Sequence, residues 1–136
     1  MYPEDLIAPM RQELAAAGFI ETKTPEEVEA NVNKEGTTLV VVNSVCGCAA
    51  GSARPGARTA VSGSKKPDRL ITVFAGNDVA AVNKARELML PFPPSSPAMA
   101  LFKDGELVHM LERHHIEGRN AEAIASNLQQ AFEEFC

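Results

Sequence analysis

An uninterrupted β-branched and apolar run, Thr37 to Val42, constrains the fold of this chain more than any other feature. The run has the length of a strand, and its apolar residues are continuous rather than alternating. Strands of this kind are typical of sheets that are covered on both faces. A second apolar run, Leu70 to Ala75, has the same character. The sequence therefore predicts a central sheet between two layers of helices.

Helical and strand patterns alternate along the rest of the chain. Helices are expected over 4–17, 24–36, 49–64 with an interruption at Pro55-Gly56, 78–89, and from Asn120 onward. Further strands are expected over 19–22, 98–103 and 106–111. The last two are joined by Asp104-Gly105, a strong signal for a two-residue hairpin turn. Thr24, Asp78 and Asn120 are placed to cap helices, so the pattern predicts one α/β domain that ends in a hairpin and a helix.

Composition excludes several classes of function. A chain of 136 residues suits one domain, and its net charge is -5. With 5% aromatic residues and no tryptophan, it offers neither a basic surface nor a stacking platform for nucleic acid. No apolar run approaches the roughly 20 residues of a membrane span. The segment MYPEDLIAPM does not have the pattern of a secretion signal, so we expect a cytoplasmic protein.

The cysteines carry the main functional signal. In the cytoplasm a structural disulfide is disfavoured, so the three cysteines indicate redox or metal chemistry. Cys46 and Cys48 lie between the buried strand and the next predicted helix. Unpaired N–H groups at a helix start stabilise a thiolate and lower its pKa from the ordinary value of about 8.5. Cys46 is therefore the candidate nucleophile, and Cys48 is the candidate resolving thiol.

The spacing of these two thiols predicts a reversible pair. Gly47 between them removes side-chain bulk, lets the backbone turn and is a candidate for contact with the substrate. A disulfide across this spacing closes a small ring, and strain makes such a bond easy to reduce. Two alternatives stay open: a pair of buried small side chains, or half of a metal site. For a metal, the chain offers Cys136 and three histidines as further ligands.

Beyond these arguments, the chain resembles the bacilliredoxin family of the thioredoxin-like superfamily, small bacterial proteins with a CGC active site. The resemblance covers nearly the whole chain. It is carried by GTTLVVVNSVCGCAAGSARP, SKKPD, TVFAGND, PSSPAMAL, RHHIEG and the terminal Cys136. It implies one thioredoxin-like domain over residues 1–136, a three-layer α/β/α sandwich with a central mixed sheet and a C-terminal β-hairpin plus helix.

The resemblance also implies a function. The protein would be a thiol-disulfide oxidoreductase that removes bacillithiol from S-bacillithiolated cytosolic proteins. Cys46 would attack the mixed disulfide, and Cys48 would resolve or modulate it. Pro97, after Ser96, would be the cis-proline that shapes the substrate groove. No cofactor would be bound, bacillithiol would be the thiol co-substrate, and the partners would be bacillithiolated or disulfide-containing proteins. The oligomeric state is left open.

The chain departs from ordinary thioredoxins at three points. Val45 stands where a tryptophan is usual, the CxxC motif is shortened to CxC, and Leu39 to Val42 holds no acidic residue. We therefore do not expect strong dithiol reductase activity. The alternative functions are a protein disulfide isomerase or reductase and, from a different class, a metal or iron–sulfur binding module that uses the CxC thiols. A third alternative is a non-enzymatic redox sensor whose oxidation alters binding to a partner protein.

Polar residues around the motif complete the candidate site. Asn43 and Ser44 are placed to donate hydrogen bonds to a thiolate. Arg54, with Arg58 further along, is a candidate for binding the anionic groups of bacillithiol, which carries a malate carboxylate. The alternative for both arginines is a solvated helix face.

Three histidines and the last cysteine each have more than one candidate role. His109, His114 and His115 are candidates for proton transfer, with surface or hydrogen-bonding roles as the alternative. Cys136 ends an amphipathic helix, and a free thiol, a capping site and an intermolecular crosslink are all compatible with its position.

Overall fold

Strand β2 (Thr37–Asn43) is buried at every residue, as the continuous apolar run predicts. In the computed structural model, which describes residues 1–136, β2 is the middle strand of a five-stranded sheet in the order β1-β3-β2-β4-β5. Leu39 and Val41 contribute to one hydrophobic core, and Val40 and Val42 to another on the opposite face. The prediction of a strand covered on both faces is confirmed.

The sheet is mixed. Its other strands are β1 (Ile20–Glu21), β3 (Arg69–Phe74), β4 (Ala98–Lys103) and β5 (Glu106–Leu111). The pairs β1–β3 and β3–β2 are parallel, whereas β2–β4 and β4–β5 are antiparallel. Asp104 and Gly105 join the last two strands with φ of 51° and 84°. A two-residue turn with both φ values positive matches the twist of the strands, so the predicted hairpin is confirmed.

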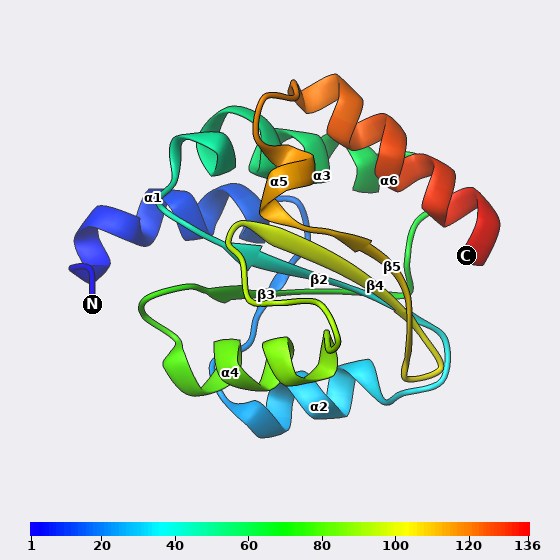
Figure 1. The fold of residues 1–136 in the computed structure, drawn as a ribbon, viewed down its shortest axis with the longest axis horizontal. Helices are drawn as coiled ribbons and strands as arrows, with labels where there is room; N and C mark the ends of the chain where they lie inside the picture. Colours follow the sequence, from blue (N-terminus) through cyan, green and yellow to red (C-terminus); the bar gives the residue numbers. More distant parts are fainter.

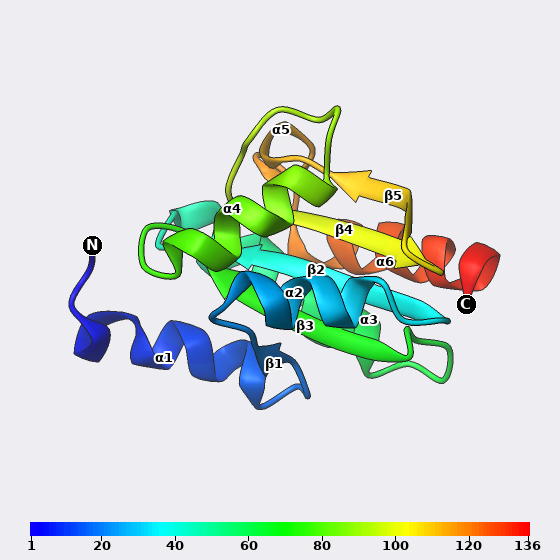
Figure 2. The same ribbon diagram turned by 90° about the horizontal axis from the view of Figure 1, so that it is seen from below.

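Helices form a layer on each face of the sheet (Figures 1 and 2). On one side lie α1 (Glu4–Ala15), α3 (Arg54–Val61) and α6 (Ala121–Phe135), and on the other lie α2 (Pro25–Val32) and α4 (Val79–Leu88). A short π-helical turn, η1 (Ala49–Ala53), precedes α3, and a four-residue helix, α5 (Arg113–Ile116), follows β5. This is the expected three-layer α/β/α sandwich, with α5 as an element that the sequence pattern did not predict. None of these helices is both long and apolar enough to cross a membrane.

Two of the three predicted helix caps are confirmed. The side chain of Thr24 accepts the backbone N–H of Glu27, and that of Asn120 accepts the backbone N–H of Ala123. Asp78 stands at the start of α4, but its side chain makes no capping bond, so that prediction is wrong. Its carboxylate instead accepts a hydrogen bond from each of the two terminal nitrogens of Arg11, with nitrogen–oxygen distances of 2.9 Å. The charged guanidinium is a stronger donor than the backbone amides at the helix start.

The helix after the CGC motif is irregular one turn earlier than expected. It passes through Pro55 and Gly56 without a break, and the distortion is the π-helical turn η1 before them. Arg54 donates its backbone N–H to the carbonyl of Ala49, five residues back. Because Pro55 has no N–H to offer to the carbonyl of Gly51, the helix widens at this point.

Gly56 lets α3 approach α6 closely, and this contact gives a first prediction. A Cβ atom at Gly56 would lie 2.7 Å from Cβ and Cγ2 of the buried Ile124. We expect Gly56→Ala to lower the free energy of unfolding by about 1–3 kcal/mol, because overpacking outweighs the better helix propensity of alanine. Urea denaturation measures this change. Gly51→Ala is the matched control, since nothing lies within 4 Å of its added Cβ; equal effects of the two substitutions would contradict the prediction.

The strand register brings three chain segments to one end of the sheet. Val42, near the end of β2, pairs with Ala98 at the start of β4. Met99 pairs with Leu111 at the end of β5. The CGC loop after β2, the SSP loop before β4 and helix α5 after β5 therefore meet at this end.

Candidate active site

Cys46 stands at the junction of strand and helix that the sequence predicts. β2 ends at Asn43, and Gly47 and Cys48 already have helical backbone that continues into η1. The carbonyl of Cys46 accepts the backbone N–H groups of Ala49 at 2.9 Å and Ala50 at 3.3 Å. Cys46 thus has the position of a helix N-cap, where the side chain faces the unpaired N–H groups of the first turn.

The two thiols of the motif form a contact pair. The sulfur atoms of Cys46 and Cys48 lie 2.8 Å apart, and both residues are reduced and half-buried. One thiol donates a hydrogen bond to the other. The expectation that Cys46 and Cys48 come within reach of each other is therefore confirmed, because the first helical turn bends the chain between them.

The environment separates the acidities of the two thiols. The hydrogen bond from Cys48 lowers the pKa of Cys46 most, and the backbone N–H groups of Cys48 and Ala49 and the charge of Arg113 also lower it, against the effect of burial. Burial, together with the hydrogen bond to Cys46 and its charge, raises the pKa of Cys48 to about 11. Cys46 is therefore the more acidic thiol of the pair and the one that forms a thiolate first, whereas Cys48 is the one that keeps its proton and donates it.

Loss of the Cys48 donor should make Cys46 less acidic. We expect Cys48→Ala to raise the pKa of Cys46, because the hydrogen bond that favours its thiolate is removed. The alkylation rate of Cys46 by iodoacetamide, followed against pH, should then rise at higher pH than in the parent protein. Both proteins carry Cys136→Ser so that only the motif reacts. Cys48→Ser keeps a hydroxyl donor and should give a smaller shift; an unchanged midpoint in Cys48→Ala would refute the assignment.

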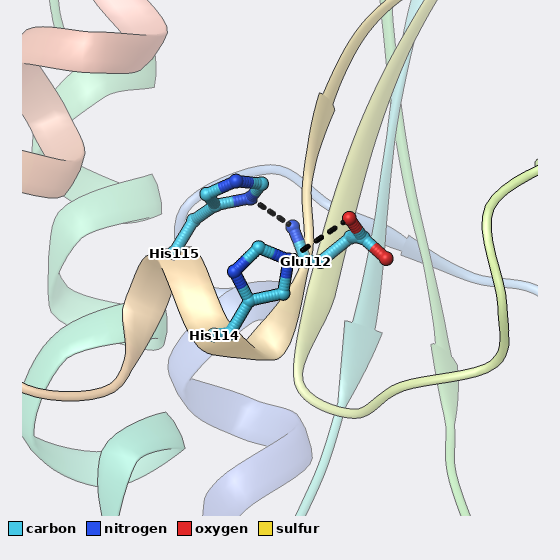
Figure 3. Close-up of side chains that lie close together, drawn as sticks. All are labelled: Glu112, His114 and His115. Atoms are coloured by element: carbon cyan, nitrogen blue, oxygen red, sulfur yellow. Dashed lines mark hydrogen bonds and ion pairs between the residues drawn. The ribbon is translucent and has the colours of Figure 1, made fainter.

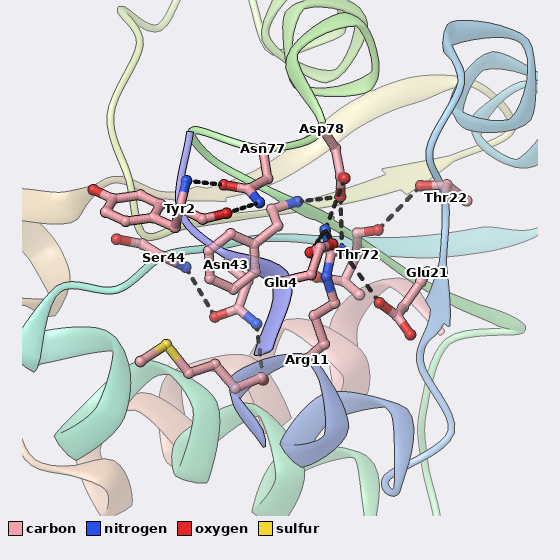
Figure 4. Close-up of polar contacts among 12 residues, drawn as sticks. Tyr2, Glu4, Arg11, Glu21, Thr22, Asn43, Ser44, Thr72, Asn77 and Asp78 are labelled. Carbon is pink, nitrogen blue, oxygen red and sulfur yellow. Dashed lines mark hydrogen bonds and ion pairs between the residues drawn. The ribbon is translucent and has the colours of Figure 1, made fainter. Parts of the chain in front are cut away.

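Asn43 and Ser44 hold the loop rather than the sulfur. The amide nitrogen of Asn43 donates to the carbonyl of Met10 at 3.1 Å, and its oxygen accepts the N–H of Ser44 at 2.9 Å (Figure 4). The hydroxyl oxygen of Ser44 accepts the N–H of Cys46 at 3.0 Å. Neither side chain donates a hydrogen bond to a thiol, so the predicted mode of action is wrong. Both residues instead fix the backbone that carries Cys46.

Arg54 belongs to the same support. Its side chain is 3% exposed, and it donates to the carboxylate of Glu13 at 2.8 Å. It also donates to the side-chain oxygen of Asn43 at 3.0 Å and to the carbonyl of Ser44 at 2.8 Å. A guanidinium buried and bonded in this way does not reach a substrate anion. The expected substrate-binding role is therefore replaced by a structural one.

A second arginine, Arg11 of α1, joins this helix to β1, to the end of β3 and to the start of α4 (Figure 4). The guanidinium of Arg11 pairs with Asp78 at 2.9 Å, with Glu4 at 3.1 Å and with Glu21 at 3.2 Å. It also lies over the ring of Phe74, 5.2 Å from the ring centroid. Met10 of the same helix accepts the bond from Asn43 at the end of β2, so this network also holds in place the helix that contacts the strand leading into the CGC loop.

Gly47 does not need to be glycine for backbone reasons. Its φ is not in the left-handed region, and an added Cβ would meet nothing within 4 Å. The bend between the cysteines is an ordinary helical turn. Gly47 is exposed, and because it has no side chain, only backbone covers the surface between the two thiols. Its part in substrate binding stays a prediction.

The SSP loop has the predicted backbone. The Ser96–Pro97 peptide bond is cis, and Pro97 is buried at the start of β4. The preceding loop also contains a cis bond between Leu90 and Pro91, which the sequence did not indicate. Contact of Ser96 and Pro97 with a substrate stays a prediction that rests on their place beside the CGC loop.

Arg113 is the charged residue at the site that the sequence reasoning missed. It lies at the start of α5, and its charge lowers the pKa of both Cys46 and Cys48. Its side chain donates to the carbonyl of Ser96 at 3.2 Å. Position 113 is far from the motif along the chain, and no local pattern marks it. The only available signal was its place in the RHHIEG stretch.

The histidines beside Arg113 form the start of α5 (Figure 3). Nδ1 of His115 accepts the backbone N–H of Glu112 at 3.0 Å, and the Glu112 carboxylate accepts the N–H of His115 in return. Nε2 of His114 lies 3.1 Å from the same carboxylate. The potential ligand atoms of these three residues lie within 4.8 Å of one another. Their mutual bonds account for the grouping as a helix cap, and His109 instead contacts Asn127.

Cys136 lies at the opposite end of the sheet from the CGC motif. Thr37, the first residue of β2, is beside it, and Figure 1 places the C-terminus at that end. Seven strand residues separate this end from the motif, a span of about 20 Å. Cys136 therefore does not act on Cys46 within one chain.

Sequence comparison finds relatives along the whole chain. A family model described as Disulphide isomerase matches residues 2–136. A bacilliredoxin from Cytophaga hutchinsonii is 63% identical over 134 residues, which is 98% of this chain and 99% of that protein. A bacilliredoxin from Halalkalibacterium halodurans is 54% identical over 136 residues, which is 99% of this chain and 94% of that protein.

Solved structures with a similar fold include thioredoxins. Mitochondrial thioredoxin 3 from Saccharomyces cerevisiae aligns with a TM-score of 0.60 over 85% of this chain and 94% of that one, at 13% identity. A thioredoxin variant from Halobacterium salinarum aligns with a TM-score of 0.61 over 88% and 91%, at 15% identity. At these identities the likeness establishes the thioredoxin fold and says nothing about the chemistry of the site.

Proposed function

Because the chain belongs to the bacilliredoxin family and also matches the Disulphide isomerase family model, we propose that it removes bacillithiol from S-bacillithiolated cytosolic proteins. More generally, it is a thiol redox enzyme with a thioredoxin fold. The observation that carries the proposal is the pair at the helix start: a thiolate-favouring Cys46 with the Cys48 sulfur 2.8 Å away. An activated thiol at a half-open site is what exchange with a mixed disulfide requires.

The first step of the proposed reaction is capture of the cap. The Cys46 thiolate attacks the bacillithiol sulfur of the mixed disulfide on the target protein. A bond forms between that sulfur and Cys46, and the bond to the target cysteine breaks. The target cysteine leaves as a thiolate and takes a proton from water. One disulfide is exchanged for another, so no outside oxidant or reductant is needed.

The second step frees Cys46. Cys48 attacks the Cys46 sulfur, the pair closes into a disulfide, and bacillithiol leaves as its thiolate. Two of the causes that raise the pKa of Cys48 are its hydrogen bond to Cys46 and the charge of Cys46. Both disappear when Cys46 is capped, so Cys48 ionises more easily after capture than before it. The order of the two attacks therefore follows from the coupling of the two thiols.

A direct experiment tests the proposal. The purified protein is mixed with a bacillithiolated target protein, and intact masses are followed with time. The target should lose the bacillithiol mass, and the cap should appear on Cys46 or as free bacillithiol with an oxidised motif. A target that keeps its cap in the presence of the fully reduced enzyme would overturn the proposal.

Disulfide isomerisation or reduction is the second candidate, because the matching family model carries that description. Against it, β2 holds no acidic residue to move protons at the thiols, since its buried residues are TTLVVVN. The reduction potential of the Cys46–Cys48 pair separates the two functions. A value near that of thioredoxin, about −270 mV, would favour reductase work.

A metal or iron–sulfur module was the alternative from a different class. The structure gathers no third metal-binding side chain around Cys46 and Cys48 within the chain. A two-thiol site is short of the four ligands that structural zinc and iron–sulfur sites use. Metal analysis of anaerobically purified protein tests this alternative directly.

A further inference from the structure

We propose that Arg113 forms a subsite that binds a carboxylate of the small thiol being transferred to Cys46. The enzyme would thereby prefer anionic low-molecular-weight thiols over neutral ones of the same size. This inference rests on the proposed exchange at Cys46 and names the class of thiol that the site accepts. It transfers to Arg113 the anion-binding role that the sequence suggested for Arg54.

The fold places Arg113 beside both reacting segments. The register pairs Met99 with Leu111 and Val42 with Ala98, so the residues just beyond these pairs meet at the end of the sheet. Arg113 donates its backbone N–H to the hydroxyl of Ser95 at 3.2 Å and its side-chain N–H to the carbonyl of Ser96 at 3.2 Å. Its guanidinium is therefore fixed to the loop that ends in the cis Ser96–Pro97 bond.

The guanidinium keeps free donors for a ligand. Its Nε donates to the carboxylate of Glu117 at 3.0 Å, and one terminal nitrogen bonds Ser96. The other N–H groups of the five-donor fork have no protein partner. The side chain is 43% exposed, in contrast to 3% for Arg54. A carboxylate can thus pair with Arg113 in the two-pronged geometry that arginine favours.

Arg113 also lies within electrostatic reach of the chemistry. Its positive charge acts on Cys46 and Cys48 together, and their charges act on it in return. A small thiol joined to Cys46 through its sulfur would keep its carboxylate tethered at the same end of the sheet as Arg113. The same guanidinium can then meet the carboxylate while the disulfide forms.

The structural alternative is that Arg113 only joins α5 to the SSP loop. That role would affect every disulfide substrate equally, whereas an anion subsite would affect charged and neutral substrates differently. The ratio of two rates therefore separates the two roles. The ratio also cancels any change in the thiolate population of Cys46, because both substrates react with the same thiolate.

The test uses two symmetrical disulfides of similar size, dithiodipropionate with carboxylates and bis(2-hydroxyethyl) disulfide without charge. Loss of the fully reduced protein is followed by acid quench and intact mass, with Cys136→Ser present throughout. The parent should react faster with the anionic disulfide. Arg113→Gln should lower the anionic-to-neutral rate ratio by about tenfold, less at high salt, and Arg113→Lys should keep part of it.

Two further variants complete the design. Arg58→Gln removes an exposed arginine of α3 and should leave the ratio unchanged. Glu117→Gln removes the competing carboxylate and should raise the ratio. An unchanged ratio in Arg113→Gln, or a parent that exchanges both disulfides without preference, would overturn the subsite and leave the proposed exchange standing. Failure of both disulfides and of the bacillithiolated protein to react would instead overturn the proposed function.

Discussion

Replacing Cys46 with serine should reduce removal of bacillithiol from a capped protein by at least about a thousandfold. The hydroxyl of serine is not ionised at neutral pH, and its side-chain neighbour would be the Cys48 thiol rather than a histidine or carboxylate base, so the attack by this residue on the mixed disulfide is lost. Serine is nearly isosteric with cysteine and is a good helix N-cap, which keeps the loop and helix folded. The measurement is the rate at which the target protein loses the bacillithiol mass.

The other two cysteines provide the controls for this experiment. Cys136→Ser, at the far end of the sheet, should leave the rate unchanged. Cys48→Ser should still capture bacillithiol and should accumulate the capped Cys46, because the resolving attack is lost while capture continues. Full activity of Cys46→Ser would rule out Cys46 as the nucleophile. Rapid turnover of Cys48→Ser without added thiol would show that Cys48 does not resolve the cap.

The parts of the fold that depend on local pattern were predicted from the sequence. The continuous apolar run of β2 requires cover on both faces, and Asp104-Gly105 requires a tight turn. Thr24 and Asn120 cap their helices because each side chain bonds a backbone N–H only three residues away. Such interactions lie within one segment, so the sequence of that segment contains the information.

Interactions between distant segments were not predicted. Asp78 has the pattern of a helix cap, but Arg11, 67 residues earlier, occupies its carboxylate. The two arginines of the site illustrate the same point. Arg54 is near the motif in sequence and is buried as a support, whereas Arg113 is distant in sequence and is exposed beside the thiols. Only the register of β2, β4 and β5 brings position 113 to the site, and that register is a property of the folded sheet.

Loss of the Arg54 side chain should destabilise the protein strongly. We expect Arg54→Met to lower the free energy of unfolding by about 3 kcal/mol, and the melting temperature by roughly 10 °C. The carbonyl of Ser44 would lose its charged donor inside the protein, and Asn43 would keep only one of its two bonds at oxygen. Glu13 is 36% exposed and would recover hydration, so it adds little to this cost.

The same variant separates support from catalysis. Arg58→Met, an exposed arginine on the same helix, should change stability by no more than about 0.5 kcal/mol. Arg54→Lys should not restore stability, because one ammonium group cannot span the three acceptors that the guanidinium joins. At a temperature where it is folded, Arg54→Met should keep the anionic-to-neutral rate ratio of the parent. A stable Arg54→Met protein that lost this preference would show that Arg54, and not Arg113, meets the substrate anion.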